Sequence, residues 1–246
     1  MNNISPILNI MIKACEKASK VIIRDFGEIE NLQVKKKGPK DFVTKTDKRV
    51  EKILIEELEK NKKNYSFITE ETGIIKKSDT DNFWIIDPID GTTNFLHGIP
   101  HFAISIALKK KNEIISGLIF DPIKNEMFYA EKNAGSFFNN RRIRVSKKIE
   151  LEDCLFATNH AGAVHSKLNL RYTGCAALDL AYVASGRFDG YFHNNINIWD
   201  IAAGVLIIKE AGGKVNDINK FDINTINIRA SNNNIHNKML ENLENF

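Results

Sequence analysis

The chain has 246 residues, of which 43% are hydrophobic and 27% charged, and its lysines and arginines exceed its aspartates and glutamates by 35 − 31 = 4. This balance is typical of a globular protein and excludes a disordered chain, a collagen and a disulfide-rich miniprotein. Three widely spaced cysteines, Cys15, Cys154 and Cys175, favour reduced thiols in a cytoplasmic protein over a disulfide framework or a zinc cluster. We expect no membrane span and no signal peptide, because no apolar stretch is long enough and residues 1–13 lack the signal pattern.

Two amphipathic helices are predicted at the start of the chain. Apolar residues recur with helical spacing from Ile4 to Ile22, and Gly27 is typical of a helix stop. A polar, basic loop follows over residues 35–41. The second helix is expected to begin near Thr46, because the apolar spacing resumes after that residue.

Short strands are predicted next, separated by Gly, Pro, Asn and Asp residues. They cover residues 66–69, 83–86, 102–108, 114–120 and 126–130, and a tight turn at 139–141 leads into a further strand. The pattern then alternates: a strand at 154–158, an irregular segment at 159–170, a helix at 176–185, a strand at 188–192 and a helix from about 200 to 212. This order predicts an α/β fold of two fused lobes, residues 1–145 and 146–246, built from layers of helices and sheets.

Several familiar sites are absent from the sequence. It contains no GxGxxG or GxxxxGK[ST] phosphate loop, no HExxH zinc motif and no GxSxG nucleophile turn. The segment that begins at Asp87 also departs from a calcium loop, because its third position is Ile89 and its twelfth is Gly98 rather than glutamate.

Residues 84–95 form the most informative segment. An apolar strand ends there and is followed by two carboxylates, Asp87 and Asp90, three positions apart. Pro88 fixes the backbone between them, and Gly91 permits a turn that leaves its N–H open to a ligand. Carboxylates beside the free N–H groups of a helix start suit a phosphate bridged by a hard cation. A structural Asx turn with a helix cap is the alternative explanation of the same residues.

Two further acidic positions favour the metal interpretation. Glu70-Glu71 follows a predicted strand, where adjacent carboxylates repel each other unless they are solvated or face a cation. Asp200 opens an apolar helix, where it is either a plain helix cap or a ligand. With Asp87 and Asp90 these residues form an oxygen-only set without His or Cys, which suits Mg²⁺ better than Zn²⁺.

Five segments, in this order and spacing, resemble the inositol monophosphatase family over nearly the whole chain. They are Lys37-Gly38-Pro39 with Asp41 to Thr44 and Thr46-Asp47, Glu70-Glu71, Asp87-Pro88-Ile89-Asp90-Gly91-Thr92-Thr93, Gly174 to Gly186, and Trp199-Asp200-Ile201-Ala202-Ala203-Gly204. Residues 94–102 look like the bacterial branch. The resemblance implies a cytoplasmic, homodimeric, Mg²⁺-dependent and lithium-sensitive phosphomonoesterase. It also implies an αβαβα layered fold of the inositol monophosphatase and fructose-1,6-bisphosphatase type.

The same resemblance implies roles for individual residues. Glu70, Asp87 and the backbone carbonyl of Ile89 would bind one Mg²⁺, and Asp87, Asp90 and Asp200 would bind a second. The catalytic residues would be Glu70, Thr92 and Asp47, because Asp47 would pair with the Thr92 hydroxyl while Glu70 and Thr92 orient the attacking water. Substrate contacts would come from Asp90, Gly91, Thr92, Ala176, His193 and Asp200, with the N–H groups of Gly91 and Thr92 on the phosphate.

Two departures from the family concern the substrate. Members that prefer inositol phosphates carry a glutamate seven residues before the aspartate of the Trp-Asp pair, and this chain has His193 there. A histidine can hydrogen-bond a hydroxyl but is not a fixed carboxylate. The segment 158–171, which forms substrate walls and subunit contacts in relatives, is also shorter than usual. We expect myo-inositol monophosphate or a related sugar or polyol phosphate, with fructose 1,6-bisphosphate, NADP or a 3′-phosphonucleotide as alternatives.

An alternative of another class is a regulatory protein that contacts RNA or the transcription machinery. Its support in the sequence is one basic cluster, which consists of Arg141, Arg142, Arg144, Lys147 and Lys148 and has no interleaved aromatic residues. The set of carboxylates favours the enzyme, because a binding module has no need of them in one cleft. Lys37 is expected either to steer anionic substrates or to be an ordinary solvated lysine, and His97 and His101 to shape the loop after the phosphate turn.

Overall fold

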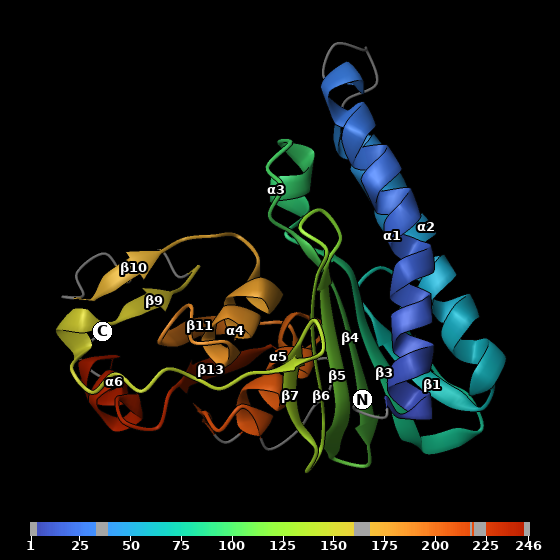
Figure 1. Ribbon diagram of the computed structural model, residues 1–246. Coiled ribbons are helices and arrows are strands. Elements are labelled where there is room, and N and C mark those ends of the chain that lie inside the picture. The colour runs from blue at the N-terminus through green and yellow to red at the C-terminus, as the bar shows by residue number, and fades with distance from the viewer. Residues whose placement is uncertain (1–3, 33–38, 160–167, 217, 219–224, 244–246) are drawn as a thin grey trace.

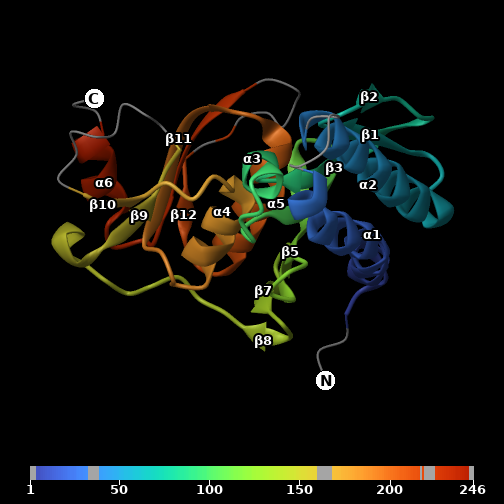
Figure 2. The same cartoon turned by 90° about the horizontal axis from the view of Figure 1, so that it is seen from above.

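Alternating layers of helices and sheets build the structure, a computed structural model that describes residues 4–32, 39–159, 168–216, 218 and 225–243. For residues 30–32 and 39–44 it describes the backbone only. Helices α1 (Pro6–Leu32) and α2 (Pro39–Asn61) lie side by side against one face of a larger sheet (Figure 1). Figure 2 shows α4 (Ala176–Ala184) and α5 (Ile198–Glu210) between this sheet and a smaller one. Helix α6 (His236–Leu243) packs on the smaller sheet, so the αβαβα order is confirmed.

The larger sheet has the strand order β2-β1-β3-β4-β5-β6-β7-β8. Its strands are β1 (Tyr65–Thr69), β2 (Gly73–Ile75), β3 (Asp79–Asp90), β4 (Ala103–Lys110), β5 (Glu113–Asp121), β6 (Glu126–Glu131), β7 (Gly135–Phe138) and β8 (Arg141–Arg142). β1 and β3 run parallel, and the other neighbouring pairs are antiparallel. Because parallel strands end at the same edge, the residues that follow β1 and close β3 meet there. The short helix α3 (Thr92–Leu96) starts at this edge.

The smaller sheet has the order β10-β9-β11-β13-β12. Its strands are β9 (Leu155–Ala157), β10 (Asn169–Arg171), β11 (Gly190–Ile196), β12 (Lys214–Val215) and β13 (Ile226–Ser231). A 3₁₀ turn, η1 (Leu151–Asp153), precedes β9. β11 leads straight into α5, so the carboxyl end of this strand delivers the first turn of α5. The expected lobe boundary at residues 145/146 stays a prediction.

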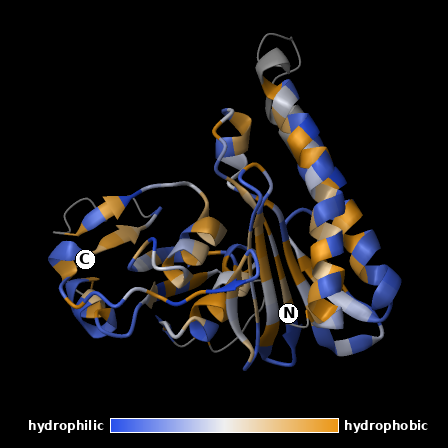
Figure 3. Cartoon of the chain, viewed as in Figure 1, coloured by the Kyte–Doolittle hydropathy of each residue, from blue (hydrophilic) through white to orange (hydrophobic). Residues whose placement is uncertain are grey.

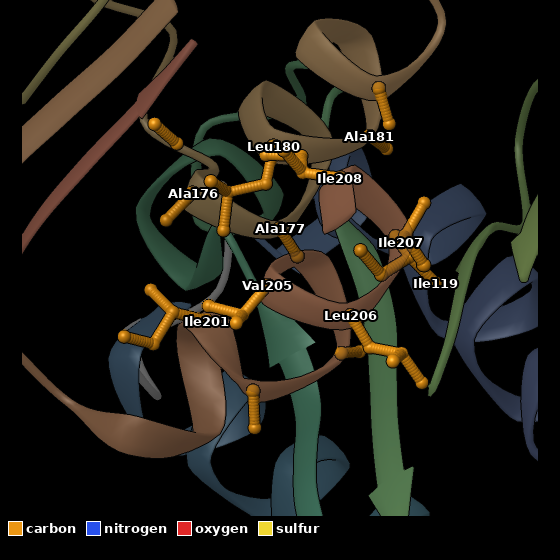
Figure 4. Close-up of a cluster of buried hydrophobic side chains, with 14 of the residues drawn as sticks. Ile119, Ala176, Ala177, Leu180, Ala181, Ile201, Val205, Leu206, Ile207 and Ile208 are labelled. Carbon is orange, nitrogen blue, oxygen red and sulfur yellow. The ribbon is translucent and has the colours of Figure 1, made fainter. Parts of the chain in front are cut away.

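In the described part of the chain, three apolar cores fill the spaces between the layers. Leu54 of α2 and Trp84 of β3 are fully buried in the first core, and Figure 3 shows apolar and polar residues mixed along α1 and α2, as helices with one covered face require. The second core holds α4 and α5 between the sheets, and its buried side chains include Leu180 and Ile207 (Figure 4). Met239 of α6 belongs to the third core. Burial of these side chains supplies most of the driving force for folding.

Helices α4 and α5 cross closely at Gly204. A Cβ atom at this position would lie 2.5 Å from Cβ of Leu180, so only glycine allows the two helices this separation. The close crossing fixes α5 against α4, and thereby fixes the first turn of α5 relative to the start of α4.

The structure corrects several expected boundaries. Gly27 does not end α1, because Ile29 continues the buried face and its packing outweighs the cost of about 1 kcal/mol for glycine in a helix. Helix α2 begins at Pro39 rather than near Thr46. Elements β2, β7, β10, β12, β13 and α6 were not predicted. The turn at Asn139-Asn140 is confirmed, since both residues have positive φ, 42° and 66°. None of the described helices is long and apolar enough to cross a bilayer.

Candidate metal and phosphate site

The parallel pair β1 and β3 positions the first acidic residues. Glu70 follows β1, and its backbone N–H donates to the carbonyl of Ile86 in β3 at 3.3 Å. Asp87 is the next residue of β3 and is 2% exposed. Its Oδ1 accepts the N–H of Ile89 at 2.9 Å, which fixes one carboxylate oxygen against its own backbone. The ladder between β3 and β4 is irregular from Asp87 to Asp90, so the strand bends where the acidic residues lie.

Gly91 makes the turn from β3 into α3. Its φ of +95° is one that side chains disfavour, and a Cβ atom here would lie 3.0 Å from the carbonyl oxygen of His101. The Thr92 hydroxyl donates to the carbonyl of Ile89 at 2.9 Å. The first N–H groups of α3 therefore follow the carboxylates directly, which is the arrangement expected of a phosphate turn.

Asp200 joins the site from α5. It lies in the first turn of that helix, and the Ser105 hydroxyl of β4 donates to the carbonyl of Trp199 at 3.2 Å. Ser105 is paired with Asp87 across β3 and β4, so the bond brings the start of α5 beside Asp87. Asp87, Asp90 and Asp200 each offer one oxygen, and these oxygens lie within 4.8 Å of one another.

The start of α4 holds the other side of Asp90. The N–H of Ala177 donates to Oδ2 of Asp90, and the Cys175 thiol donates to the same atom at 3.2 Å. Burial raises the pKa of the Cys175 thiol well above its usual value, so it remains a protonated donor and no nucleophile. One oxygen of Asp90 is thus fixed by the protein, which leaves the other to a ligand.

When ionised, the carboxylates carry negative charge that no cation in the described part of the chain balances. Burial, followed by repulsion from Glu70, raises the pKa of Asp47 to about 8, and burial raises the pKa of Glu70, Asp90 and Asp200 to about 7. The pKa of Asp87 is also raised, again mainly by burial. Among the described residues, no lysine or arginine forms an ion pair with any of the five.

The donor set fits a hard divalent cation. All of the donors are carboxylate or carbonyl oxygens, which Mg²⁺ prefers, and the surplus of negative charge requires a cation when the carboxylates ionise. The oxygen Oδ1 of Asp47 supports the same conclusion, because it is buried and has no hydrogen-bond partner. A buried acceptor without a partner is costly, and an incoming ligand or its water would relieve this cost.

The expected pairing of Asp47 with the Thr92 hydroxyl is not present. That hydroxyl donates to the carbonyl of Ile89, and Asp47 Oδ1 is unbonded. The physical reason is local: the Ile89 carbonyl lies one turn before Thr92 and accepts its hydroxyl, whereas Asp47 must reach across from α2.

The remaining predicted residues belong to α4, to β11 and to the loop after α3. Ala176 is the first residue of α4, and His193 lies partly buried on β11. His97 is exposed, while the backbone carbonyl of His101 contributes to the loop after α3. Lys37 lies outside the described residues.

Sequence reasoning missed several residues that support the site. Glu51 of α2 accepts the N–H of Glu71 at 2.9 Å, and Ser105 connects β4 to α5. Asn94 and Thr173 join α3 to the loop before α4. A single sequence gives no signal for these contacts, since each depends on a partner that is distant along the chain.

Comparison with known proteins gives a consistent result. Residues 3–245 match the Inositol monophosphatase family. An inositol-1-monophosphatase of Rhizobium meliloti is 47% identical over 224 residues, which covers 85% of this chain and 84% of that protein. The Nus factor SuhB of Haemophilus influenzae is 41% identical over 243 residues, 93% of this chain and 90% of that protein. The crystal structure of the extragenic suppressor protein suhB from Bartonella henselae has a TM-score of 0.87 at 43% identity, covering 98% of this chain and 100% of that one.

Proposed function

The chain belongs to the inositol monophosphatase family of phosphoric monoester hydrolases, and from this premise we propose that it uses Mg²⁺ to hydrolyse myo-inositol monophosphate or a related sugar or polyol phosphate. The observation that carries the proposal is the grouping of Asp87, Asp90 and Asp200 within 4.8 Å beside the phosphate turn. These residues come from two different lobes of the expected division, so the site exists only in the folded chain.

The proposed metal ligands are the oxygen donors that meet at the edge of the larger sheet where β1 and β3 end. Glu70, Asp87 and the Ile89 carbonyl form one set, and Asp87, Asp90 and Asp200 form the other. The Ile89 carbonyl already accepts the Thr92 hydroxyl, but a carbonyl oxygen has a second lone pair for a cation. When bound, the cations supply positive charge that neutralises the phosphate dianion and the leaving alkoxide.

The protein's own groups then bind and orient the reactants. The N–H groups of Gly91 and Thr92 would donate to the phosphate oxygens and so hold the phosphorus for in-line attack. Glu70 and the Thr92 hydroxyl orient the attacking water, and Glu70 accepts a proton from it. The pKa of Asp47 is raised by burial and by repulsion from Glu70, so Asp47 is the residue to which we assign that proton next.

The alcohol half of the substrate faces a different set of residues. We assign Ala176 and His193 to it, because they lie on the elements that adjoin Asp90 and Asp200. A histidine in place of a carboxylate widens the range of alcohols. Fructose 1,6-bisphosphate, NADP and 3′-phosphonucleotides therefore belong in the test.

A phosphate-release assay tests the proposal. The substrates named above are offered with Mg²⁺, with EDTA and with Mg²⁺ plus Li⁺. We expect release from at least one monoester that requires Mg²⁺, is inhibited by Li⁺ and is abolished in D87N. Release that persists in EDTA or in D87N would refute the assignment of the site. The expected homodimer is tested on the same preparation by light scattering.

A second candidate function is a role in transcription, favoured by the relatives called Nus factor SuhB. Among the described residues its surface support is the basic cluster, and Lys148 of that cluster is already paired with the buried Asp189 at 2.9 Å. Binding of a structured RNA that weakens in R141A/R144A, in a protein that releases no phosphate, would favour this role over the enzyme.

A further inference from the structure

The side-chain amide of Asn94 joins two loops that are distant in the sequence. Its Nδ2 atom donates to the carbonyl of His101 at 2.8 Å and to the carbonyl of Thr173 at 2.8 Å. Both N–H groups of the amide are therefore used, one on the loop after α3 and one on the loop before α4. Asn94 is buried, so water cannot easily replace either bond.

The Thr173 end of this bridge leads to Asp90. The Thr173 hydroxyl accepts the N–H of Cys175 at 3.3 Å and donates to Oδ1 of Asp179 at 2.7 Å, which fixes the turn that starts α4. From this turn the Cys175 thiol and the Ala177 N–H reach the carboxylate of Asp90. The start of α4, which orients Asp90, is thus connected through Thr173 and Asn94 to α3, the helix that follows Asp90.

Gly174 shows how close this contact is. Its φ is +81°, and a Cβ atom there would lie 3.1 Å from Nδ2 and 3.2 Å from Oδ1 of Asn94. A side chain at residue 174 would therefore push the amide from its position. The glycine and the amide together bring the start of α4 against α3.

We propose that Asn94 is a positioning residue of the phosphatase site. Its amide locks the phosphate turn to the start of α4, so that Asp90 and the N–H groups of the turn keep a fixed relative geometry. Only an amide serves, because a carboxylate would place acceptor oxygens against the two carbonyl oxygens. The catalytic consequence rests on the proposed function, whereas the tether itself is a property of the fold.

Four proteins test this role: the wild type, N94D, G174A and the control N232D. Asn232 is a matched control, because it is also buried and its amide also donates twice, to Oγ of Ser146 at 2.8 Å and to the carbonyl of Lys148 at 3.2 Å. It lies between β13 and α6, away from the acidic cluster. The measurements are Mg²⁺ affinity by calorimetry without substrate, kcat/KM, thermal unfolding, and hydrogen exchange of residues 173–184.

In N94D we expect Mg²⁺ affinity and kcat/KM to fall roughly 10- to 100-fold, as for other residues that orient a ligand, with faster exchange at 173–184. We expect Mg²⁺ affinity and kcat/KM to fall in G174A as well, so G174A tests the positioning role if N94D does not fold. N232D lowers the unfolding temperature but keeps Mg²⁺ affinity and kcat/KM. Wild-type affinity and exchange in folded N94D and G174A would overturn the proposal. A wild type that neither binds Mg²⁺ nor releases phosphate refutes the proposed function and the positioning role with it, while the exchange rates still decide whether the tether exists.

Discussion

The Ser105 hydroxyl donates a hydrogen bond to the carbonyl of Trp199 at 3.2 Å and joins two residues that are 94 positions apart. Ser105 is the β4 partner of Asp87, and Trp199 precedes Asp200. One buried hydroxyl thus sets the separation of two carboxylates that come from a strand and from a helix.

We therefore expect S105A to weaken Mg²⁺ binding more than it weakens the fold. The loss of one hydrogen bond costs about 1 kcal/mol of unfolding free energy, while the freed start of α5 changes the geometry of Asp200. Calorimetric Mg²⁺ titration beside urea unfolding separates the two effects. Ser136 supplies the control, since its buried hydroxyl has no partner and S136A removes the same atom without a bond. Equal Mg²⁺ affinities in S105A and S136A would contradict the role of this bond.

The variant D90N is expected to lose activity and gain stability in the absence of metal. The neutral amide removes one of the charges that repel each other in the site, yet its oxygen still accepts the Ala177 N–H. We expect a fall of roughly 100-fold or more in kcat/KM, beyond the effect of residues that only orient a ligand. Melting curves in EDTA at pH 8 should show a higher midpoint than the wild type.

Asp121 provides the opposite case as a control. It is also buried, but Lys124 balances its charge at 2.7 Å. D121N should therefore lower the melting midpoint under the same conditions, because it removes a paired charge rather than a repelled one. If both variants shift the midpoint in the same direction, the unbalanced charge of Asp90 is not what destabilises the metal-free site.

The pH dependence of stability follows from the same carboxylates. In the folded chain the pKa is about 8 for Asp47 and about 7 for Glu70, Asp90 and Asp200, against ordinary values of 3.8 to 4.5. Between about pH 4 and pH 8 the folded state thus binds more protons than the unfolded chain, so the free energy of unfolding decreases as pH rises. We expect the melting midpoint in EDTA to drop from pH 5 to pH 8.

Added Mg²⁺ should reverse this drop, because a cation binds the ionised carboxylates of the folded state. The gain in melting midpoint on adding Mg²⁺ is then larger at pH 8 than at pH 5. Scanning calorimetry with and without Mg²⁺ at both pH values measures it. A gain that is equal at the two pH values would show that these carboxylates do not bind the ion.

The sequence was sufficient for the features that depend on local pattern. The helical spacing predicted α1 and α5, the apolar runs predicted the central strands, and the Asp-Pro-Ile-Asp-Gly order predicted the turn at Gly91. The shared oxygen chemistry of the acidic residues indicated that Asp200 belongs with Asp87, and the family resemblance implied that both bind the same ion, since nothing local relates the two residues.

Features decided by packing were not predictable in this way. The cost of Gly27 within α1 is outweighed by contacts with other layers, which one segment does not reveal. Likewise β13 pairs with β11 and β12, and its own short apolar pattern is weak without those partners. The amide of Asn94 meets Thr173 only because the sheet edge and α4 adjoin in the fold.

The last prediction concerns His193, which stands where inositol-preferring relatives carry a glutamate. It lies on β11 at the ladder irregularity that precedes Asn197 and α5, so its side chain is placed by the same segment that delivers Asp200. A glutamate there would accept hydrogen bonds from a polyol's hydroxyl groups, whereas it would repel a substrate with a second anionic group.

We expect H193E to raise kcat/KM for inositol 1-phosphate relative to fructose 1,6-bisphosphate by about tenfold, a difference of about 1.4 kcal/mol. The ratio of the two kcat/KM values in wild type and variant is the measurement, and H193Q is the control, because it keeps the hydrogen-bonding capacity without the charge. If H193Q shifts the ratio as far as H193E, the discrimination arises from hydrogen bonding alone and the charge argument fails.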